Sequence, residues 1–157
     1  MNESDSSFPN NAKRPIGWIV YLILIASFIG FLDAGYLTYS FYSGQALKCT
    51  ILASCNVVTS SSYSKVLGLP LSVYGAVFYL TVFGLALIVL DRSRFSFLTL
   101  IFYLAAGAVL VSLYLVYLQA FVLKAWCFYC VVSAALSAVI FISAWLGMRK
   151  GLTGATV

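Results

Sequence analysis

The apolar residues of this chain fall into four long stretches separated by more polar segments. The stretches cover approximately residues 15–42, 70–90, 95–123 and 126–147. A helix needs about 20 consecutive apolar residues to cross the hydrocarbon core of a membrane, and each stretch reaches that length. The pattern therefore predicts an all-α integral membrane four-helix bundle, with a long outer loop between the first and second helices.

Two prolines and the lengths of the stretches refine this prediction. Pro15 and Pro70 stand where the first and second helices begin, and proline suits a first helical turn. The third stretch is longer than a straight crossing requires, so we expect that helix to tilt or to project beyond the membrane. We expect residues 15–147 to form the bundle, residues 1–14 a flexible cytoplasmic tail and residues 148–157 a second cytoplasmic tail.

Basic residues near the predicted helix ends indicate the orientation in the membrane. Cytoplasmic segments carry an excess of Lys and Arg. One side of the predicted bundle has six, against three on the other. The six are Lys13, Arg14, Arg92, Arg94, Arg149 and Lys150, and the three are Lys48, Lys65 and Lys124. We therefore expect a multi-pass protein of the cell (inner) membrane with both termini in the cytoplasm and the long loop on the outer face.

The amino-acid composition excludes several common kinds of catalytic site. Of 157 residues, 63% are hydrophobic and 8% are charged, with no histidine and four Asp and Glu in total. A Ser-His-Asp triad, a histidine metal site and a paired-carboxylate glycosidase centre all lack their residues. The net charge of +5 mostly reflects the orientation bias, so we expect no nucleic-acid partner. The reactive groups that remain are Cys49, Cys55, Cys127 and Cys130.

Two of these cysteines form a C-x-x-C at the start of the fourth predicted helix. The exposed N–H groups and positive dipole of a helix start stabilise a thiolate on Cys127, and Lys124 adds a nearby positive charge. Cys130 lies one turn deeper, about 4.5 Å along the axis. We expect Cys127 near water and Cys130 nearer lipid. A redox dithiol is the favoured interpretation, and a structural disulfide that holds the helix end is the alternative.

The other two cysteines, Cys49 and Cys55, lie in the long outer loop. Five residues separate them, and so small a ring gains little stability from a disulfide in the chain-entropy account. The pair suits a shuttle between an external protein and the C-x-x-C. Four cysteines allow three pairings, and a shuttle visits more than one.

The electrons of such a relay need an acceptor. A strongly oxidising partner of the DsbA type requires an acceptor of higher potential, and the sequence has no flavin or haem signature, which points to a membrane quinone. A zinc site of four thiolates is the competing assignment, but the first cysteine spacing is too long for a typical structural zinc site. We therefore expect no metal.

Several further segments resemble the bacterial homologues of vitamin K epoxide reductase (VKOR). They are Asp33-Ala34-Gly35-Tyr36-Leu37-Thr38, Ser54-Cys55-Asn56-Val57-Val58, Ser61-Ser62-Tyr63, Val66-Leu67-Gly68-Leu69-Pro70-Leu71-Ser72 with Gly75, and the C-x-x-C itself. The likeness covers roughly residues 15–147, with the order and spacing of the cysteines intact.

This resemblance implies a four-helix bundle around a quinone (of the menaquinone, ubiquinone or phylloquinone type) and roles for all four cysteines. Cys49 would face a thioredoxin-like or DsbA-like partner, and Cys55 would pass electrons to Cys127 through a mixed disulfide. Cys130 would act at the quinone. The family's serine or threonine falls on Ser61, which would bond a quinone oxygen or stabilise the loop. A solvated loop serine is the alternative there.

One departure from the family narrows the expected activity. Vertebrate members have a tyrosine four residues after the C-x-x-C, where this chain has Ala134. We therefore expect quinone reduction rather than epoxide reduction. Because the chain carries no thioredoxin-like segment, its partner is expected to be a separate protein. The function expected is oxidation of that partner, in support of disulfide formation outside the cytoplasm.

Two other protein classes compete with this interpretation. DsbB-type oxidases carry the C-x-x-C in the first outer loop, and the reversed order here argues against that family. A tetraspanin-like scaffold with structural disulfides is the non-enzymatic alternative. The small residues Ser133, Ala134, Ser137 and Ala138 suit close helix packing in either case.

The remaining candidates are polar or aromatic residues inside the predicted spans. Acidic residues in membrane helices are often functional, but Asp33 lies close to the outer interface, so a structural hydrogen bond is favoured over proton transfer. Six aromatic residues gather in the outer half of the bundle, and we expect each to face lipid or pack in the core. They are Phe78, Tyr79, Tyr114, Tyr117, Trp126 and Tyr129.

Overall fold

Four long helices form the bundle in the computed structural model, which describes residues 14–43, 65–66, 68–92 and 95–153. The helices are α1 (Arg14–Ser43), α3 (Leu71–Arg92), α4 (Phe95–Tyr117) and α5 (Phe128–Thr153). Each contains a span long and apolar enough to cross a membrane. The four spans are Gly17–Ser43, Leu71–Asp91, Ser96–Val122 and Phe128–Arg149. The predicted all-α membrane bundle is confirmed, with span limits within about two residues of those expected.

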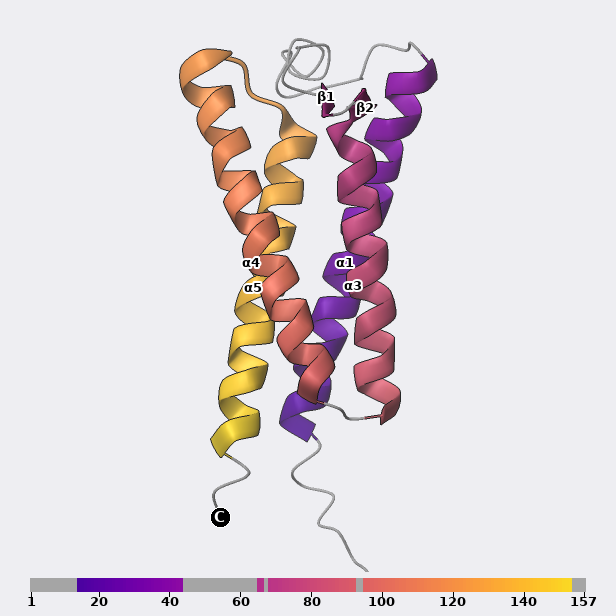
Figure 1. Ribbon diagram of the computed structural model, residues 1–157, viewed down its shortest axis with the longest axis vertical. Helices are drawn as coiled ribbons and strands as arrows, with labels where there is room; N and C mark the ends of the chain where they lie inside the picture. Colours follow the sequence, from indigo (N-terminus) through magenta and orange to yellow (C-terminus); the bar gives the residue numbers. More distant parts are fainter. Residues whose placement is uncertain (1–13, 44–64, 67, 93–94, 154–157) are drawn as a thin grey trace, which may run out of the picture.

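The helices alternate in direction along the long axis of the molecule (Figure 1). The start of α1, the end of α5 and the α3–α4 connection lie at one end, and the α4–α5 connection lies at the other. A short antiparallel pair, β1 (Lys65–Val66) and β2 (Leu69–Pro70), leads into α3 at that second end. Gly68 has φ +83° at its turn, a conformation in which a side chain is unfavourable.

Three of the contacts between helices are extensive, and a fourth is smaller. The most extensive contacts join α1 to α3, α4 to α5 and α1 to α5, and α3 meets α4 over a smaller area. Large buried side chains fill the centre, namely Ile23, Tyr79, Val82, Leu98, Ile101 and Ile140. Gly30 of α1 faces the ring of Tyr79 on α3 so closely that a Cβ at Gly30 would overlap the ring. This glycine therefore sets how near α1 and α3 approach.

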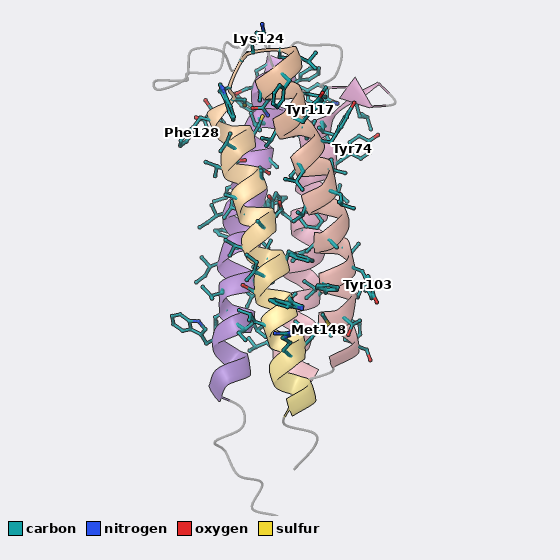
Figure 2. The ribbon with its side chains drawn as sticks, turned by 90° about the vertical axis from the view of Figure 1, so that its left-hand side faces the viewer. Tyr74, Tyr103, Tyr117, Lys124, Phe128 and Met148 are labelled. Atoms are coloured by element: carbon teal, nitrogen blue, oxygen red, sulfur yellow. The ribbon has the colours of Figure 1, made fainter. Side chains whose placement is uncertain are left out.

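The outside of the bundle is apolar as well. Leu110 and Phe121 are each 69% exposed, and Tyr103 is 68% exposed. Figure 2 shows Tyr103 pointing away from α4. An apolar surface this extensive is unfavourable in water and favourable in lipid, so the chain is a multi-pass membrane protein.

The last part of the third apolar stretch contains a change of helix type. After Tyr117, α4 continues as a π-helix, η2 (Leu118–Val122). In it the N–H of Leu123 donates to the carbonyl of Leu118 at 2.8 Å. Lys124 has φ +47°, and the chain turns there toward α5. The side chain of Lys124 points along the axis away from the bundle (Figure 2).

Candidate functional site

The C-x-x-C lies at the first turn of α5, and its first cysteine caps the helix. Helix α5 begins at Phe128, and the carbonyl of Cys127 accepts the N–H of Val131 at 3.1 Å. The N–H of Cys130 points at Cys127 Sγ at 3.4 Å. This is the bond that an N-cap side chain makes to the third residue of a helix. The predicted placement of the motif at a helix start is confirmed.

The two sulfurs are adjacent and unbonded. Both cysteines are free, and Cys130 Sγ lies 2.6 Å from Cys127 Sγ, toward which it donates a hydrogen bond. A disulfide bond is about 2.05 Å long, so oxidation of this pair requires only a small side-chain movement. The hydrogen bond from the Cys130 thiol lowers the pKa of Cys127, although burial acts in the opposite direction.

The burial of the two cysteines is the reverse of what the sequence suggested. Cys127 has no exposed surface, whereas Cys130 is partly exposed. Cys127 packs in a small apolar cluster with Leu37 of α1 and Ala125 of the connection before α5. The expectation that Cys127 lies near water was wrong, because the chain folds back at Lys124 and covers the end of the helix. Lys124 is exposed and is not among the groups that shift the Cys127 pKa.

A cavity of about 310 Å³ lies between the four helices, and Cys130 is part of its wall. Most of its lining is aliphatic or aromatic, with a few polar groups. Besides Cys130, the polar residues of the lining are Ser72, Tyr74, Tyr79, Ser112, Gln119, Ser133 and Ser137. Cavities that bind small molecules commonly have this character, with a few polar groups in an apolar surface.

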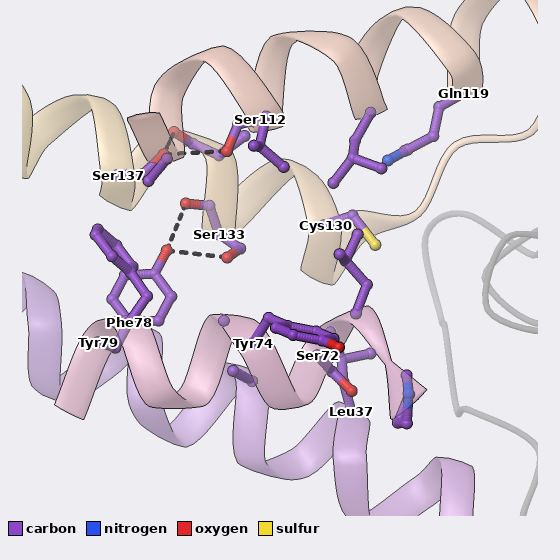
Figure 3. Close-up of a pocket in the computed structure, with 18 of the residues that line it drawn as sticks. Leu37, Ser72, Tyr74, Phe78, Tyr79, Ser112, Gln119, Cys130, Ser133 and Ser137 are labelled. Carbon is purple, nitrogen blue, oxygen red and sulfur yellow. Dashed lines mark hydrogen bonds between the residues drawn. The ribbon is translucent and has the colours of Figure 1, made fainter. Parts of the chain in front are cut away.

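Two hydrogen-bonded groups join the helices across this cavity (Figure 3). The hydroxyl of Tyr79 on α3 donates to the carbonyl of Ser133 on α5 at 2.7 Å and lies 2.9 Å from Ser133 Oγ. Ser112 of α4 and Ser137 of α5 lie 3.3 Å apart through their hydroxyls. Since Ser133 is one turn from Cys130, the first of these groups fixes the part of α5 that carries the motif.

The family of this chain follows from a comparison with known sequence families. The Vitamin K epoxide reductase family matches residues 21–145, which is most of the chain and includes the cysteine motif. The chain belongs to the vitamin K epoxide reductase family. The resemblance noted in the sequence is thereby confirmed, and the chain is a membrane oxidoreductase.

Residues in the segments that resemble the VKOR family also connect α1 to α3. Thr38 Oγ1 donates to the carbonyl of Ala34 at 2.8 Å and lies 2.9 Å from Ser72 Oγ. Gly75 sits opposite Ala34, where a Cβ would come within 3.6 Å. These residues hold the C-terminal part of α1 against the start of α3, where both helices border the cavity.

Sequence reasoning missed one polar residue of this VKOR site, Gln119. Its side chain is 2% exposed, and its Oε1 accepts the N–H of Cys127 at 3.1 Å. Its backbone carbonyl accepts the N–H of Ala125 at 3.1 Å. An amide inside an otherwise apolar stretch, eight residues before the motif, was the signal that could have identified it.

The aromatic and small residues have more specific roles than expected. Tyr79 is fully buried and lines the cavity together with Phe78, whereas Tyr114 and Tyr117 are more than half exposed. Of the small residues on α5, Ser133, Ala134 and Ser137 also line the cavity. These small residues therefore form part of the cavity wall in addition to the helix-packing role expected from the sequence.

Asp33 on α1 is half-buried, and its Oδ2 is fully enclosed without a hydrogen-bond partner among the described residues. The structural hydrogen bond favoured from the sequence is therefore not found for this oxygen in the described part of the chain. The charge of Asp33 acts on Cys127 and raises its pKa, in opposition to the hydrogen bonds there. Asp33 thus belongs to the surroundings of the VKOR motif.

Three predicted site residues lie outside the described residues, namely Cys49, Cys55 and Ser61. Their roles remain predictions from the sequence. Among the residues that the structure describes, no group of three or more Cys, Asp or Glu side chains lies close enough to hold a metal ion. Those residues therefore supply no ligand set for the zinc alternative.

Proposed function

We propose that this VKOR protein is a quinone-dependent thiol oxidase. It re-oxidises a separate thioredoxin-like or DsbA-like protein and so supports disulfide formation outside the cytoplasm. Electrons pass from Cys49 and Cys55 to Cys127 and Cys130, and from there to a membrane quinone. One observation carries this proposal: two free, adjacent thiols stand at a helix start, and the second of them borders an apolar cavity.

The residues around the cavity fit a quinone. The volume of about 310 Å³ is within the range of small-molecule sites, which begins at about 300 Å³. The lining is mainly apolar and also supplies hydroxyl and amide groups. A bound quinone would accept two electrons and two protons, which is what oxidation of a dithiol to a disulfide releases. The cavity is lined by residues of the apolar helices that span the membrane, and membrane quinones are lipid-soluble.

The surroundings of the two cysteines suit different roles. Cys127 accepts hydrogen bonds from the N–H and the thiol of Cys130, which favour its thiolate. It is therefore the sulfur suited to thiol exchange with Cys55. Because Cys127 packs against Ala125 and Leu37, exchange requires the segment with Ala125 to move aside. Cys130 faces the cavity and is the sulfur suited to act at the quinone.

We further propose that the cysteine motif lies at the outer face of the cell (inner) membrane and that both termini are cytoplasmic. The excess of Lys and Arg at the opposite end supports this orientation. The start of α1 and the end of α5 lie together at that opposite end (Figure 1). The motif would then face the oxidising compartment in which disulfides persist.

The proposal is tested with the purified full chain in lipid nanodiscs. A reduced DsbA-type protein is supplied with ubiquinone-1, and quinone reduction is followed by absorbance. We expect Cys127→Ala and Cys130→Ala each to reduce the rate by at least about 100-fold, because a single cysteine cannot form the internal disulfide that the relay requires. Ser143→Ala, a buried position elsewhere on α5, is the matched control and should keep the wild-type rate.

Wild-type rates in both cysteine variants would refute the proposed relay. A second measurement separates it from a tetraspanin-like scaffold. In a Cys55→Ala variant, the free thiol of Cys49 should attack the disulfide of an oxidised DsbA-type protein and hold that protein as a mixed disulfide that reductant releases. Two inert internal disulfides and no trapped protein would favour the scaffold instead.

A further inference from the structure

A buried amide, the side chain of Gln119, lies beside the C-x-x-C and has no part in the relay described above. It stands in η2, where the N–H of Leu123 bonds five residues back to Leu118. A π turn of this kind is rare and often accompanies a functional site, because it shifts the side chains that follow it around the helix axis. Here η2 places Gln119 in the wall of the cavity with 2% of its surface exposed.

The hydrogen bond with Cys127 determines which way this amide points. Gln119 Oε1 accepts the N–H of Cys127 at 3.1 Å. An amide carries its oxygen acceptor and its two N–H donors on different sides, so Nε2 points away from Cys127. Figure 3 shows the side-chain nitrogen directed toward the other residues that line the cavity. Among the residues that the structure describes, the hydrogen bond made by this side chain is the one through Oε1, and Nε2 is not one of the fully enclosed polar atoms that lack a partner.

The hydroxyl groups deeper in the cavity are already engaged. Tyr79 bonds Ser133, and Ser112 bonds Ser137. Polar groups inside a protein nearly always have a hydrogen-bond partner, and because Gln119 lines the cavity, a molecule bound there can supply an acceptor for Nε2. The acceptor that a membrane quinone offers is a carbonyl oxygen.

We propose that Gln119 Nε2 donates a hydrogen bond to a carbonyl oxygen of the quinone and so positions its ring beside Cys130. This inference rests on the proposed function. As Cys127 and Cys130 form a disulfide, they release two electrons and two protons, and the two carbonyl oxygens of the quinone become hydroxyls of the quinol. An N–H donor at one of these oxygens stabilises the negative charge that develops on it. The same amide holds the backbone of Cys127, so one side chain aligns both reactants.

Two variants separate this role from a purely structural one. Gln119→Glu keeps an oxygen acceptor for the N–H of Cys127 but has no N–H donor when ionised. Gln119→Met has a similar length and lacks both groups. The full chain in nanodiscs is reduced with dithiothreitol, and two quantities are measured at pH 8. One is the Kd for menadione, from quenching of tryptophan fluorescence. The other is the pH profile of Cys127 alkylation by iodoacetamide, assigned by mass spectrometry.

We expect both variants to bind menadione at least about tenfold more weakly and to reduce it about 100-fold more slowly, as expected for loss of one well-placed donor. In Gln119→Glu, the added negative charge beside Cys127 should move the midpoint of its alkylation profile to higher pH, as the charge of Asp33 does. Ser143→Ala should match the wild type in every measurement. Wild-type affinity in both variants would overturn the assignment, and so would weaker binding in Gln119→Met alone, because that variant is the one that loses the bond to the N–H of Cys127.

The outcomes also separate this inference from the proposed function. If the wild-type chain binds and reduces menadione and the Gln119 variants have the same affinity and rate, the inference alone is overturned. A wild-type chain that binds menadione but does not reduce it would refute the oxidase function, and the affinity difference would still support Gln119 as the donor. A wild-type chain that binds no quinone would overturn both.

Discussion

The chemistry of Cys127 is decided by groups within a few ångströms of its sulfur. The thiol and the N–H of Cys130 both point at Cys127 Sγ, and these bonds favour the thiolate. Burial and the charge of Asp33 favour the thiol. The hydrogen bonds prevail, and the pKa of Cys127 lies below its ordinary value of 9.0. The hydrogen bonds thus favour the thiolate of Cys127 even though this residue has no exposed surface.

At this scale we predict that Asp33→Asn increases the reactivity of Cys127. An ionised Asp33 raises the pKa of Cys127 by charge repulsion. The asparagine removes that charge at nearly the same size, so the pKa falls further and the thiolate forms at lower pH. The measurement is the midpoint of Cys127 alkylation by iodoacetamide as a function of pH, with mass spectrometry to assign the site.

Asp91→Asn is the matched control for this prediction. It makes the same chemical change at the far end of α3, and Asp91 is not among the groups that shift the Cys127 pKa. Its alkylation midpoint should equal that of the wild type. A midpoint for Asp33→Asn that stays the same or moves to higher pH would contradict the prediction.

At the scale of elements, a few contacts between helices hold the motif against the cavity. Tyr79 of α3 fills the space beside Gly30 of α1, and its hydroxyl bonds Ser133 of α5. On the other side, η2 brings Gln119 to the backbone of Cys127. The first turn of α5 is therefore fixed from α1, α3 and η2 together. Interhelical hydrogen bonds of this kind contribute about 0.6 kcal/mol each on average in membranes.

We predict that Gly30→Ala destabilises the bundle. The added Cβ would overlap the ring of Tyr79, which is fully buried and cannot move without losing its bonds to Ser133. Overpacking of this kind costs about 1–3 kcal/mol. The measurement is the thermal unfolding midpoint of the chain in nanodiscs, followed by tryptophan fluorescence.

The same helix offers a control for this substitution. Nothing lies within 4 Å of a Cβ at Gly35, so Gly35→Ala should leave the midpoint unchanged or raise it slightly, because alanine is the better helix former by about 1 kcal/mol. Equal unfolding midpoints for the two alanine variants would contradict the prediction, because they would show that the close contact of Gly30 with Tyr79 does not affect the stability of the bundle.

At the scale of the whole molecule, the reactive groups gather at one end of the bundle. The cysteine motif, η2 and the hairpin before α3 lie there, and the start of α1 and the end of α5 lie at the other end (Figure 1). An even number of crossings requires this arrangement of the ends. The proposed orientation then decides which compartment supplies the thiols.

We predict that the two ends are labelled from opposite sides of the membrane. Lys124→Cys and Ser96→Cys are made in a chain whose four native cysteines are alanine, and both positions are exposed. In intact cells, a membrane-impermeant maleimide should label the Lys124→Cys variant and should label the Ser96→Cys variant only after lysis. The opposite pattern would reverse the proposed orientation, and labelling of both in intact cells would contradict the four-span topology.

The sequence by itself determined the properties that depend on order along the chain. Four apolar stretches set the number and limits of the spans, since the length of an apolar run is what a bilayer requires. The position of Cys127 and Cys130 at the start of the fourth apolar stretch placed the motif at a helix start, and the resemblance in the motif segments identified the family. None of these properties requires knowledge of which helix faces contact one another.

The tertiary structure decided which side of each helix forms the site. The helices are apolar on all sides, so no periodic pattern distinguishes a buried face from one exposed to lipid. Gln119 and Tyr79 became site residues only when η2 and the contact at Gly30 brought them to the cavity. The burial of Cys127 depends on the reversal of the chain at Lys124. These contacts join distant segments, and their geometry arises only when the helices pack.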